Sequence, residues 1–291
     1  MTEQRPTVRA RELGEALRAA LEKAGVTGKE VARELQWSQS EVSRMLSGKR
    51  GVKESDVATL LGYCRIGGTE HKRLLKLCEE ANKPGWWQQY GSRLPTQLRT
   101  YLDHEDKAVA IHDFAANIIP GSLQTSDYAR EVIAHTANVP PVEVDQRTKA
   151  RIERAAIFNR SRTARFTFYL HEFVLRLPVG GQAVMSDQLH HLLRMSVRPS
   201  ITLRVVPAGI GAHAGAAGAF VFMEFAEIKP VVYLEAETSA LFLEEQEEIR
   251  AYRRVLASLA ETALPEAQSR DLVSSLATEL YLDREESDEH D

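Results

Sequence analysis

Residues 27–50 read TGKEVARELQWSQSEVSRMLSGKR and contain two helix starts in close succession. Thr27 is followed three residues later by Glu30, and Ser38 is followed three residues later by Glu41. A serine or threonine with a glutamate at this spacing is typical of a capping box, in which side chains satisfy the first backbone N–H groups of a helix. The stretch therefore predicts two short helices joined by a tight turn at the Gln-Trp pair between them.

Two short helices can dock as a rigid pair, with the second helix in the major groove of DNA, when small and apolar residues lie where the helices touch. Ala32 matters most, because a large side chain at this position would push the helices apart. The predicted interior of the motif consists of Val31, Ala32, Leu35, Trp37, Val42 and Met45.

The second helix, predicted over residues 38–46, carries polar side chains on its other face. Glutamine suits adenine, arginine suits guanine, and serine can pair with several base edges in the major groove. The candidate base contacts are Gln39, Ser40, Ser43 and Arg44, and the candidate phosphate contacts are Thr27, Ser38, Lys49 and Arg50. Glu34 and Glu41 would repel phosphate, so a helical interaction module that binds no DNA remains the alternative.

Helical periodicity continues on both sides of the motif. Leu13, Leu17, Ala20 and Leu21 share one helix face, and this run ends at Gly25, a residue that favours helix C-termini. The predicted segments are a flexible basic arm at residues 1–10 and a five-helix unit over residues 11–82, whose last two helices span residues 54–63 and 69–82.

Residues 11–65 resemble the helix-turn-helix of the phage-repressor-like, xenobiotic-response-element family of bacterial regulators. Ala32, Val42 and the Ser-Gly-Lys at residues 47–49 fall in register with that family. The resemblance implies that the start and middle of the second helix read bases, which in this chain are Gln39, Ser40 and Arg44.

Two positions depart from the pattern of this family. Gly28 stands where the family often has a glutamine, so one phosphate or base contact is in doubt. Gln36 stands where the family often has a glycine in the turn. Gln36 must therefore adopt any positive φ angle that the turn requires, although polar residues can occupy such turns.

The rest of the chain mixes strand-like and helix-like runs, which predicts an α+β domain with a mixed sheet covered by helices, over residues 83–282. Strands are predicted over residues 165–175, 201–207, 219–225 and 231–236, while residues 108–119 fit either a helix or a strand. Helices are predicted over residues 126–136, 142–158, 186–195, 244–263 and 266–280. Residues 283–291 hold six acidic residues and one arginine, and predict a disordered tail.

Several stretches of this domain resemble the WhiJ-like actinobacterial regulators, which join such a helix-turn-helix to an antitoxin-like C-terminal domain. They are GWW at 85–87, IPGSLQT at 119–125, DYA at 127–129, PVGG at 178–181, Met185 with Gln188-Leu189 and Leu192, and VVYLE at 231–235. The resemblance implies a small protein partner encoded by a neighbouring gene. Large amphipathic side chains in these stretches fit either domain packing or a binding site. The candidate partner or effector residues are Trp86, Trp87, Gln124, Tyr128 and His213.

Composition and charge are those of an ordinary soluble chain, with 291 residues of which 43% are hydrophobic. No apolar run approaches the roughly 20 residues that a membrane span needs, and the charged N-terminus does not predict a secretory signal, so we expect a cytoplasmic protein. The first 80 residues hold 15 basic and 12 acidic residues, a net charge of +3, and the remainder holds 22 and 29, a net charge of −7. This distribution fits a DNA-binding module on an acidic body. Cys64 and Cys78 are predicted to be reduced core thiols.

No pattern of a catalytic or metal-binding site stands out. His171-Glu172 lacks the second histidine of a zinc-protease helix, and His190-His191 point apart by about 100° on a helix. The glycine-rich residues 209–218 precede a strand-like run, which predicts a flexible hairpin loop rather than a phosphate cradle. We therefore expect no enzymatic activity, no cofactor and no metal, and keep His213 in this loop as a candidate for effector sensing.

Three functions fit these residues. The first is a DNA-binding transcriptional regulator that forms a homodimer and places its recognition helices about 34 Å apart on a palindromic operator. The second is an antitoxin-like protein that binds and neutralises a small partner encoded next to it. The third is a regulator that senses a small molecule through its C-terminal domain.

Overall fold

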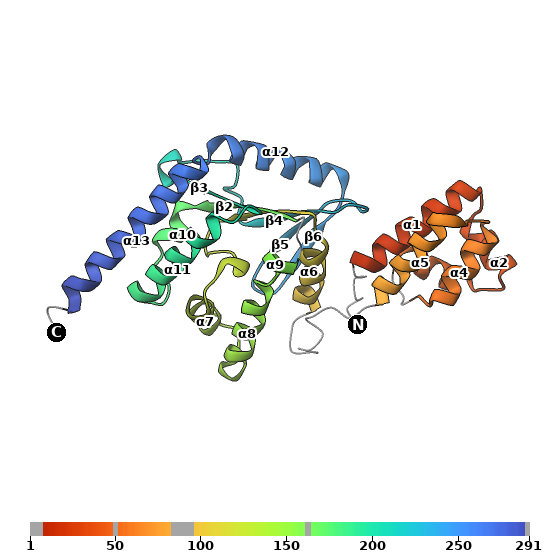
Figure 1. Cartoon of the computed structure of the whole chain (residues 1–291), viewed down its shortest axis with the longest axis horizontal. Helices are drawn as coiled ribbons and strands as arrows, with labels where there is room; N and C mark the ends of the chain where they lie inside the picture. The colour runs from red at the N-terminus through yellow and green to blue at the C-terminus, as the bar shows by residue number, and fades with distance from the viewer. Residues whose placement is uncertain (1–7, 49–51, 83–95, 161–163, 289–291) are drawn as a thin grey trace. The chain divides into compact units, whose positions relative to one another are not determined.

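The computed structural model describes residues 8–48, 52–82, 96–160 and 164–288. The chain forms two compact units, Met1–Lys107 with Ala226–Ile228, and Ala108–Phe225 with Lys229–Asp291. The first unit is helical and the second combines helices with a six-stranded mixed sheet (Figure 1). This architecture confirms the predicted fold class.

The described part of the first unit is built from helices. They are α1 (Val8–Ala24), α2 (Gly28–Glu34), α3 (Gln39–Leu46), α4 (Glu54–Tyr63), α5 (Gly68–Asn82) and α6 (Thr96–Lys107). The five helices up to Asn82 match the predicted ones, whereas α6 has no counterpart among the predictions. Residues 8–10 are helical, although we assigned them to a flexible arm.

The core of the first unit joins the first five helices. One buried cluster contains Leu13 and Leu17 of α1 together with Leu60 and Leu61 of α4, and all four residues are at most 1% exposed. Cys78 of α5 belongs to the same cluster, and its Sγ donates a hydrogen bond to the Val52 carbonyl at 3.4 Å. Burial raises the pKa of the Cys78 thiol, so the thiol stays protonated in the core.

Helix α1 passes very close to the end of α3 because two glycines allow it. A Cβ atom at Gly14 would lie 2.5 Å from the Leu46 carbonyl oxygen, and a Cβ atom at Gly48 would lie 2.6 Å from the Ala10 carbonyl oxygen. Gly48 also has a φ angle of +70°, which a residue with a side chain rarely adopts. The contact with Gly48 fixes the first turn of α1, which explains why the helix includes residues 8–10.

The second unit is organised around one sheet with the strand order β3-β2-β1-β4-β5-β6. The strands are β1 (Ala110–Ala115), β2 (Arg165–His171), β3 (Ile201–Val206), β4 (Phe220–Glu224), β5 (Val231–Glu235) and β6 (Ala240–Leu243). Strands β1, β2 and β3 run parallel, and β4, β5 and β6 continue the sheet in antiparallel pairs. The ambiguous residues 108–119 thus contain a strand, and β6 has no predicted counterpart.

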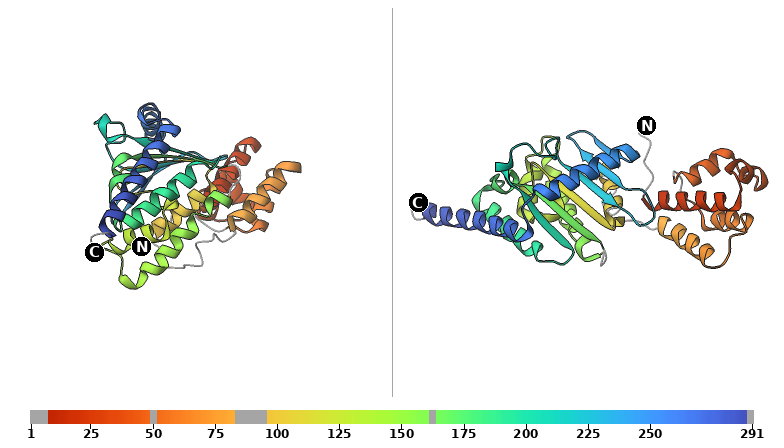
Figure 2. Two further views of the ribbon diagram at one scale, coloured as in Figure 1. Left: turned by 60° about the vertical axis from the view of Figure 1, so that its left-hand side comes forward. Right: turned by 90° about the horizontal axis from the view of Figure 1, so that it is seen from above.

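Helices cover both faces of this sheet (Figures 1 and 2). Helix α12 (Gln246–Thr262) packs on one face, where Ile249 and Leu259 meet Phe114, Phe220 and Phe222 from the strands. The other helices are α7 (Ser126–Ala134), α8 (Val144–Arg154), α9 (Ile157–Arg160), α10 (Glu172–Arg176), α11 (Gly181–Ser196) and α13 (Glu266–Asp288). Helices α7, α8 and α11 lie on the opposite face, and α13 packs along α11.

Two predicted elements of the second unit end elsewhere than expected. Residues 172–175, which we predicted as strand, belong to α10. The His171 side chain accepts a hydrogen bond from the Phe173 N–H and thereby caps a new helix. An ion pair of 2.7 Å between Arg176 and Glu172 further stabilises this helix. Helix α13 continues to Asp288, although we predicted disorder from residue 283. A helix that is already nucleated extends at little cost through glutamate and arginine, which are good helix formers.

The glycine-rich residues 209–218 do not form the predicted hairpin loop. A hairpin joins neighbouring strands, but β3 lies at the sheet edge and β4 pairs with β1, so the connection crosses β2 and β1. A Cβ atom at Gly215 would lie 2.4 Å from the Phe114 ring. Glycine therefore serves here to let the backbone pass directly over an aromatic side chain.

The close approach of α1 and α3 gives a test of the fold. Gly14→Ala should lower the free energy of unfolding by about 1–3 kcal/mol, because the added methyl group meets backbone atoms that cannot yield. Gly62→Ala is the matched control, since Gly62 lies exposed in α4 with no atom within 4 Å of its Cβ position. It should raise the free energy of unfolding by about 0.5–1 kcal/mol. Urea denaturation of both variants measures the difference, and equal effects of the two substitutions would contradict the close packing.

Candidate nucleic-acid interface

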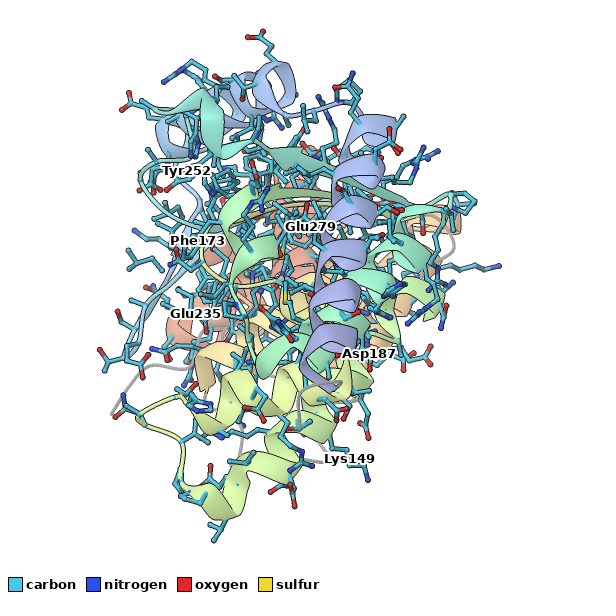
Figure 3. All side chains as sticks on the ribbon, turned by 90° about the vertical axis from the view of Figure 1, so that its left-hand side faces the viewer. Lys149, Phe173, Asp187, Glu235, Tyr252 and Glu279 are labelled. Carbon is cyan, nitrogen blue, oxygen red and sulfur yellow. The ribbon has the colours of Figure 1, made fainter. Side chains whose placement is uncertain are left out.

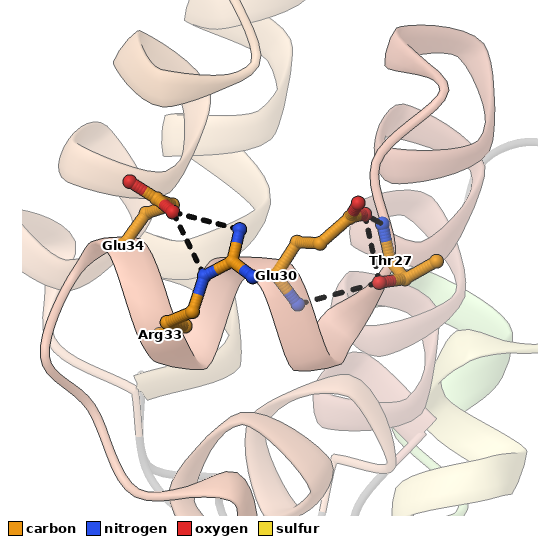
Figure 4. A network of polar contacts seen from close by, with 4 residues as sticks. All are labelled: Thr27, Glu30, Arg33 and Glu34. Atoms are coloured by element: carbon orange, nitrogen blue, oxygen red, sulfur yellow. Dashed lines mark hydrogen bonds and ion pairs between the residues drawn. The ribbon is translucent and has the colours of Figure 1, made fainter.

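Helix α2 begins with a complete capping box at Thr27 (Figure 4). The Thr27 hydroxyl accepts a hydrogen bond from the Glu30 N–H at 3.3 Å, and Glu30 Oε2 accepts from the Thr27 N–H at 2.7 Å and from its hydroxyl at 2.8 Å. These bonds lower the pKa of the Glu30 carboxyl group, because they stabilise its charged form. The start of α2 is therefore fixed by its own side chains.

Helix α3 begins in the same way at Ser38. The Ser38 hydroxyl accepts from the Glu41 N–H at 3.1 Å, and Glu41 Oε2 accepts from the Ser38 N–H at 3.1 Å and from its hydroxyl at 2.9 Å. We expected Glu34 and Glu41 to repel phosphate near this motif. In the structure both carboxylates have protein partners: Glu41 caps α3, and Glu34 forms an ion pair of 2.9 Å with Arg33.

The turn between the two helices is closed by backbone hydrogen bonds. The Trp37 N–H donates to the Ala32 carbonyl at 2.9 Å, and the Gln36 N–H donates to the Arg33 carbonyl at 3.4 Å. This pair of bonds is the Schellman arrangement, which requires a left-handed residue just after the helix. Gln36 supplies it with a φ angle of +55°, so the residue that departs from the family pattern adopts the conformation of the missing glycine.

The residues assigned to the interior of the motif lie between the helices and the core. Val31, Ala32, Val42 and Met45 are at most 6% exposed. Leu35 and Trp37 are half-buried and pack against the same cluster. The small side chain of Ala32 lies under the turn, where its own carbonyl accepts the bond that closes it.

The candidate base contacts all lie on the exposed face of α3. Gln39, Ser40, Ser43 and Arg44 are exposed, while Val42 on the same helix is buried. Arg44 Nε donates to the Ser40 carbonyl at 3.2 Å, so the guanidinium group lies along the helix and would swing outward to reach a base edge.

The candidate phosphate contacts are placed less directly. The hydroxyls of Thr27 and Ser38 are exposed, but each already donates its proton to a capping glutamate. A hydrogen bond from either hydroxyl to phosphate would require that proton to leave the carboxylate. Lys49 and Arg50 lie outside the described residues.

Gln124 and Tyr128, candidates for a partner or effector site, hold the turn of residues 119–125 in the second unit. Gln124 Nε2 donates to the Ile119 carbonyl at 2.7 Å, and the Tyr128 hydroxyl accepts from the Ile119 N–H at 3.3 Å. Gln188 of α11, to which we assigned no role, completes the network: its amide accepts from the Thr125 N–H at 2.7 Å. All three side chains are at most 3% exposed. A buried glutamine in an apolar helix pattern is the signal that could have predicted this network.

His213 contacts a different set of residues. Its ring stacks on that of His171 with centroids 5.2 Å apart, and meets the edge of Phe114 at 5.6 Å. His213 Nδ1 accepts from the Gly215 N–H at 3.1 Å, which ties the ring to its own loop. Trp86 and Trp87 lie outside the described residues.

Comparison with known proteins also divides the chain in two, although the second match begins within α6, which belongs to the first compact unit. Residues 98–275 match the family model of a domain of unknown function, DUF5753, and residues 12–74 match the model of a helix-turn-helix domain. The chain belongs to the DUF5753 family. No curated protein and no solved structure matches it. In this DUF5753 protein, an N-terminal helix-turn-helix domain precedes the family domain and suggests a DNA-binding regulator.

The described residues of the DUF5753 protein show neither a membrane-spanning helix nor a cluster of metal ligands. No helix there combines the length and the apolar character that crossing a bilayer requires. Within the same part of the chain, histidine, cysteine, aspartate and glutamate do not gather in groups of three or more that could hold a metal ion.

The left-handed turn residue can be tested by substitution. Gln36→Gly should raise the free energy of unfolding by about 0.5–1 kcal/mol, because glycine adopts a positive φ angle without the steric cost that glutamine meets there. Gln36→Ala should give no such gain, since alanine keeps a Cβ atom. Thermal unfolding measures both variants, and a loss of stability in Gln36→Gly would contradict the strained turn.

The capping carboxylate of Glu30 predicts a pH dependence. Because the folded-state pKa of Glu30 is lowered, its contribution to stability is present above its unfolded pKa of about 4 and is lost as the pH falls through the folded value. Wild type should therefore be more stable than Glu30→Gln at neutral pH, and the two should converge in acid. Urea denaturation across pH 2–7 measures this, and a difference that is constant with pH would show that the charge of Glu30 has no role.

Proposed function

We propose that this protein is a sequence-specific, DNA-binding transcriptional regulator that reads the major groove with α3. The observation that carries the proposal is the division of this one helix. Its inner side chains are buried against α2 and the core, while Gln39, Ser40, Ser43 and Arg44 remain exposed on a rigid, capped scaffold.

The chemistry of these side chains assigns each a role. Gln39 at the start of α3 would pair bidentately with adenine, and Arg44, five residues later on the same helix, would pair with guanine. Ser40 and Ser43 would add shorter contacts to base edges. The phosphate backbone would be contacted by Thr27 and Ser38, which cap α2 and α3, and by Lys49 and Arg50, which follow α3 in the sequence. On this proposal the chain is not an enzyme.

We further propose that the protein acts as a homodimer of the WhiJ-like type. A two-fold dimer would present two α3 helices about 34 Å apart and select a palindromic operator. The second unit would then serve dimerisation, or binding of an effector or of a small antitoxin-type partner.

Binding of the full chain to the DNA upstream of its own gene, against a scrambled duplex, tests the proposal. A site-specific complex at about 150 mM salt is expected, since base contacts survive screening better than phosphate contacts do. Loss of all discrimination would reduce α3 to a phosphate-binding helix. No binding at low or moderate salt would contradict the proposal and favour the partner-binding role.

The contribution of Arg44 is tested on the same site. Arg44→Ala should weaken binding by about 1–3 kcal/mol and relax the preference at one base position. Lys72→Ala is the control, because it removes one exposed positive charge from α5, outside the helix pair. Equal losses in both variants, or a uniform loss on all sequences, would show that Arg44 contributes charge and not base recognition.

A further inference from the structure

One face of α8 carries three arginines in the acidic second unit. Arg147, Arg151 and Arg154 follow one another at helical spacings of four and three residues, which places them on the same side of the helix. Arg147 pairs with Glu143 through nitrogen–oxygen distances of 2.8 and 3.0 Å. Its charge is therefore compensated within α8 and its cap.

Arg151 is compensated differently. Its guanidinium group makes one hydrogen bond to the described part of the chain, from Nη1 to the amide oxygen of Gln124 at 3.2 Å. Over the described residues, no carboxylate oxygen lies within 4 Å of its nitrogen atoms. The partner is thus a neutral acceptor, and this acceptor is held in place because Gln124 Nε2 donates to the Ile119 carbonyl.

The surroundings disfavour the charge on Arg151. Burial lowers its pKa to about 10, and the neighbouring Arg154 and Arg147 contribute in the same direction, while Glu235 of β5 opposes them. The group remains protonated at neutral pH. A partly buried guanidinium without a close anion carries a desolvation cost that a bound anion would offset.

The backbone at Gly121 lies directly beside the side chains of Arg151 and Arg154. A Cβ atom at Gly121 would lie 3.1 Å from Arg154 Nη1 and 3.6 Å from Arg151 Nε. One turn before Arg151 on α8, the Thr148 hydroxyl is buried without a hydrogen-bond partner in the described structure, and the residue is 3% exposed. A threonine inside a helix usually donates to the carbonyl four residues earlier, so α8 carries an unsatisfied buried hydroxyl three residues before Arg151.

We propose that Arg151 is the centre of a binding site for a small anionic ligand that presents a carboxylate or phosphate group. The planar guanidinium would bind two oxygens of the ligand with the donors that Gln124 leaves free, and Arg154 would add positive charge from the next turn. The turn of residues 119–125 forms one wall of this site, so a ligand would stiffen the buried network of Gln124, Tyr128 and Gln188. The site lies in the second unit and its existence does not depend on DNA reading by α3.

Titration calorimetry of the full chain without DNA, at constant ionic strength, tests the site with inorganic phosphate and with succinate as separate probes. At least one probe should bind to wild type, and Arg151→Gln should weaken its binding at least about tenfold. Lys149→Gln is the matched control, because Lys149 lies exposed on the same helix and carries the same charge (Figure 3). It should change the dissociation constant by less than about twofold.

A second variant, Arg151→Lys, allows the same comparison if Arg151→Gln does not fold. Arg151→Lys retains the charge but loses the planar pair of donors, so it should also bind the probe about tenfold more weakly. Binding that is equal in wild type and in both Arg151 variants would place the anion elsewhere and overturn the proposal. Absence of binding of either probe to wild type at about 10 mM would overturn it as well.

Discussion

The orientation of α3 relative to α2 depends on one backbone hydrogen bond, from the Trp37 N–H to the Ala32 carbonyl at 2.9 Å. This bond forms only if Gln36 accepts a left-handed conformation, and only if residue 32 is small enough for the chain to turn back over it. Once it is made, the N-terminus of α3 is fixed relative to α2. The capping box at Ser38 then starts α3 at once, and the exposed side of that helix follows from its buried side.

Close backbone contacts recur as the means by which this chain orients its elements. Gly14 and Gly48 let α1 meet the end of α3, and Gly215 lets the crossover connection pass over Phe114. In the second unit, buried amides have the same role that glycines have in the first. Gln124, which directly follows the 3₁₀ helix of residues 121–123, and Gln188 of α11 both satisfy backbone groups of residues 119–125. This turn thereby becomes a fixed part of the interior.

The helices of the first unit could be predicted from short sequence patterns, because the residues that start and end each helix lie within a few positions of its ends. The caps at Thr27 and Ser38 and the break at Gly25 are examples, and α4 has the bounds predicted for it. The second unit depends more on distant contacts. The connection after β3 looked like a hairpin because nothing in residues 207–220 shows that β4 pairs with β1, and the helix α10 was hidden in a strand-like run because its cap is a histidine.

Some features of the candidate sites could likewise be predicted from local sequence, whereas others depend on distant contacts. Which residues of α3 are exposed follows from helical periodicity alone, and Gln39 and Arg44 lie where that periodicity predicts. In contrast, residue spacing does not predict two other features of the structure. They are the hydrogen bonds that the Thr27 and Ser38 hydroxyls donate to glutamates, and the proximity of Arg151 to Gln124. The first requires the rotamers of both partners, and the second joins residues that are 27 positions apart.

The central claim, that α3 reads base edges, is tested most directly by selecting binding sites from a random double-stranded DNA library with wild type and with Gln39→Ala. The account predicts that wild type enriches a short motif and that Gln39→Ala enriches the same motif with the preference lost at one position. Two results would contradict this claim. Wild type would enrich no motif, or the Gln39→Ala and Arg44→Ala variants would each enrich the same motif as wild type.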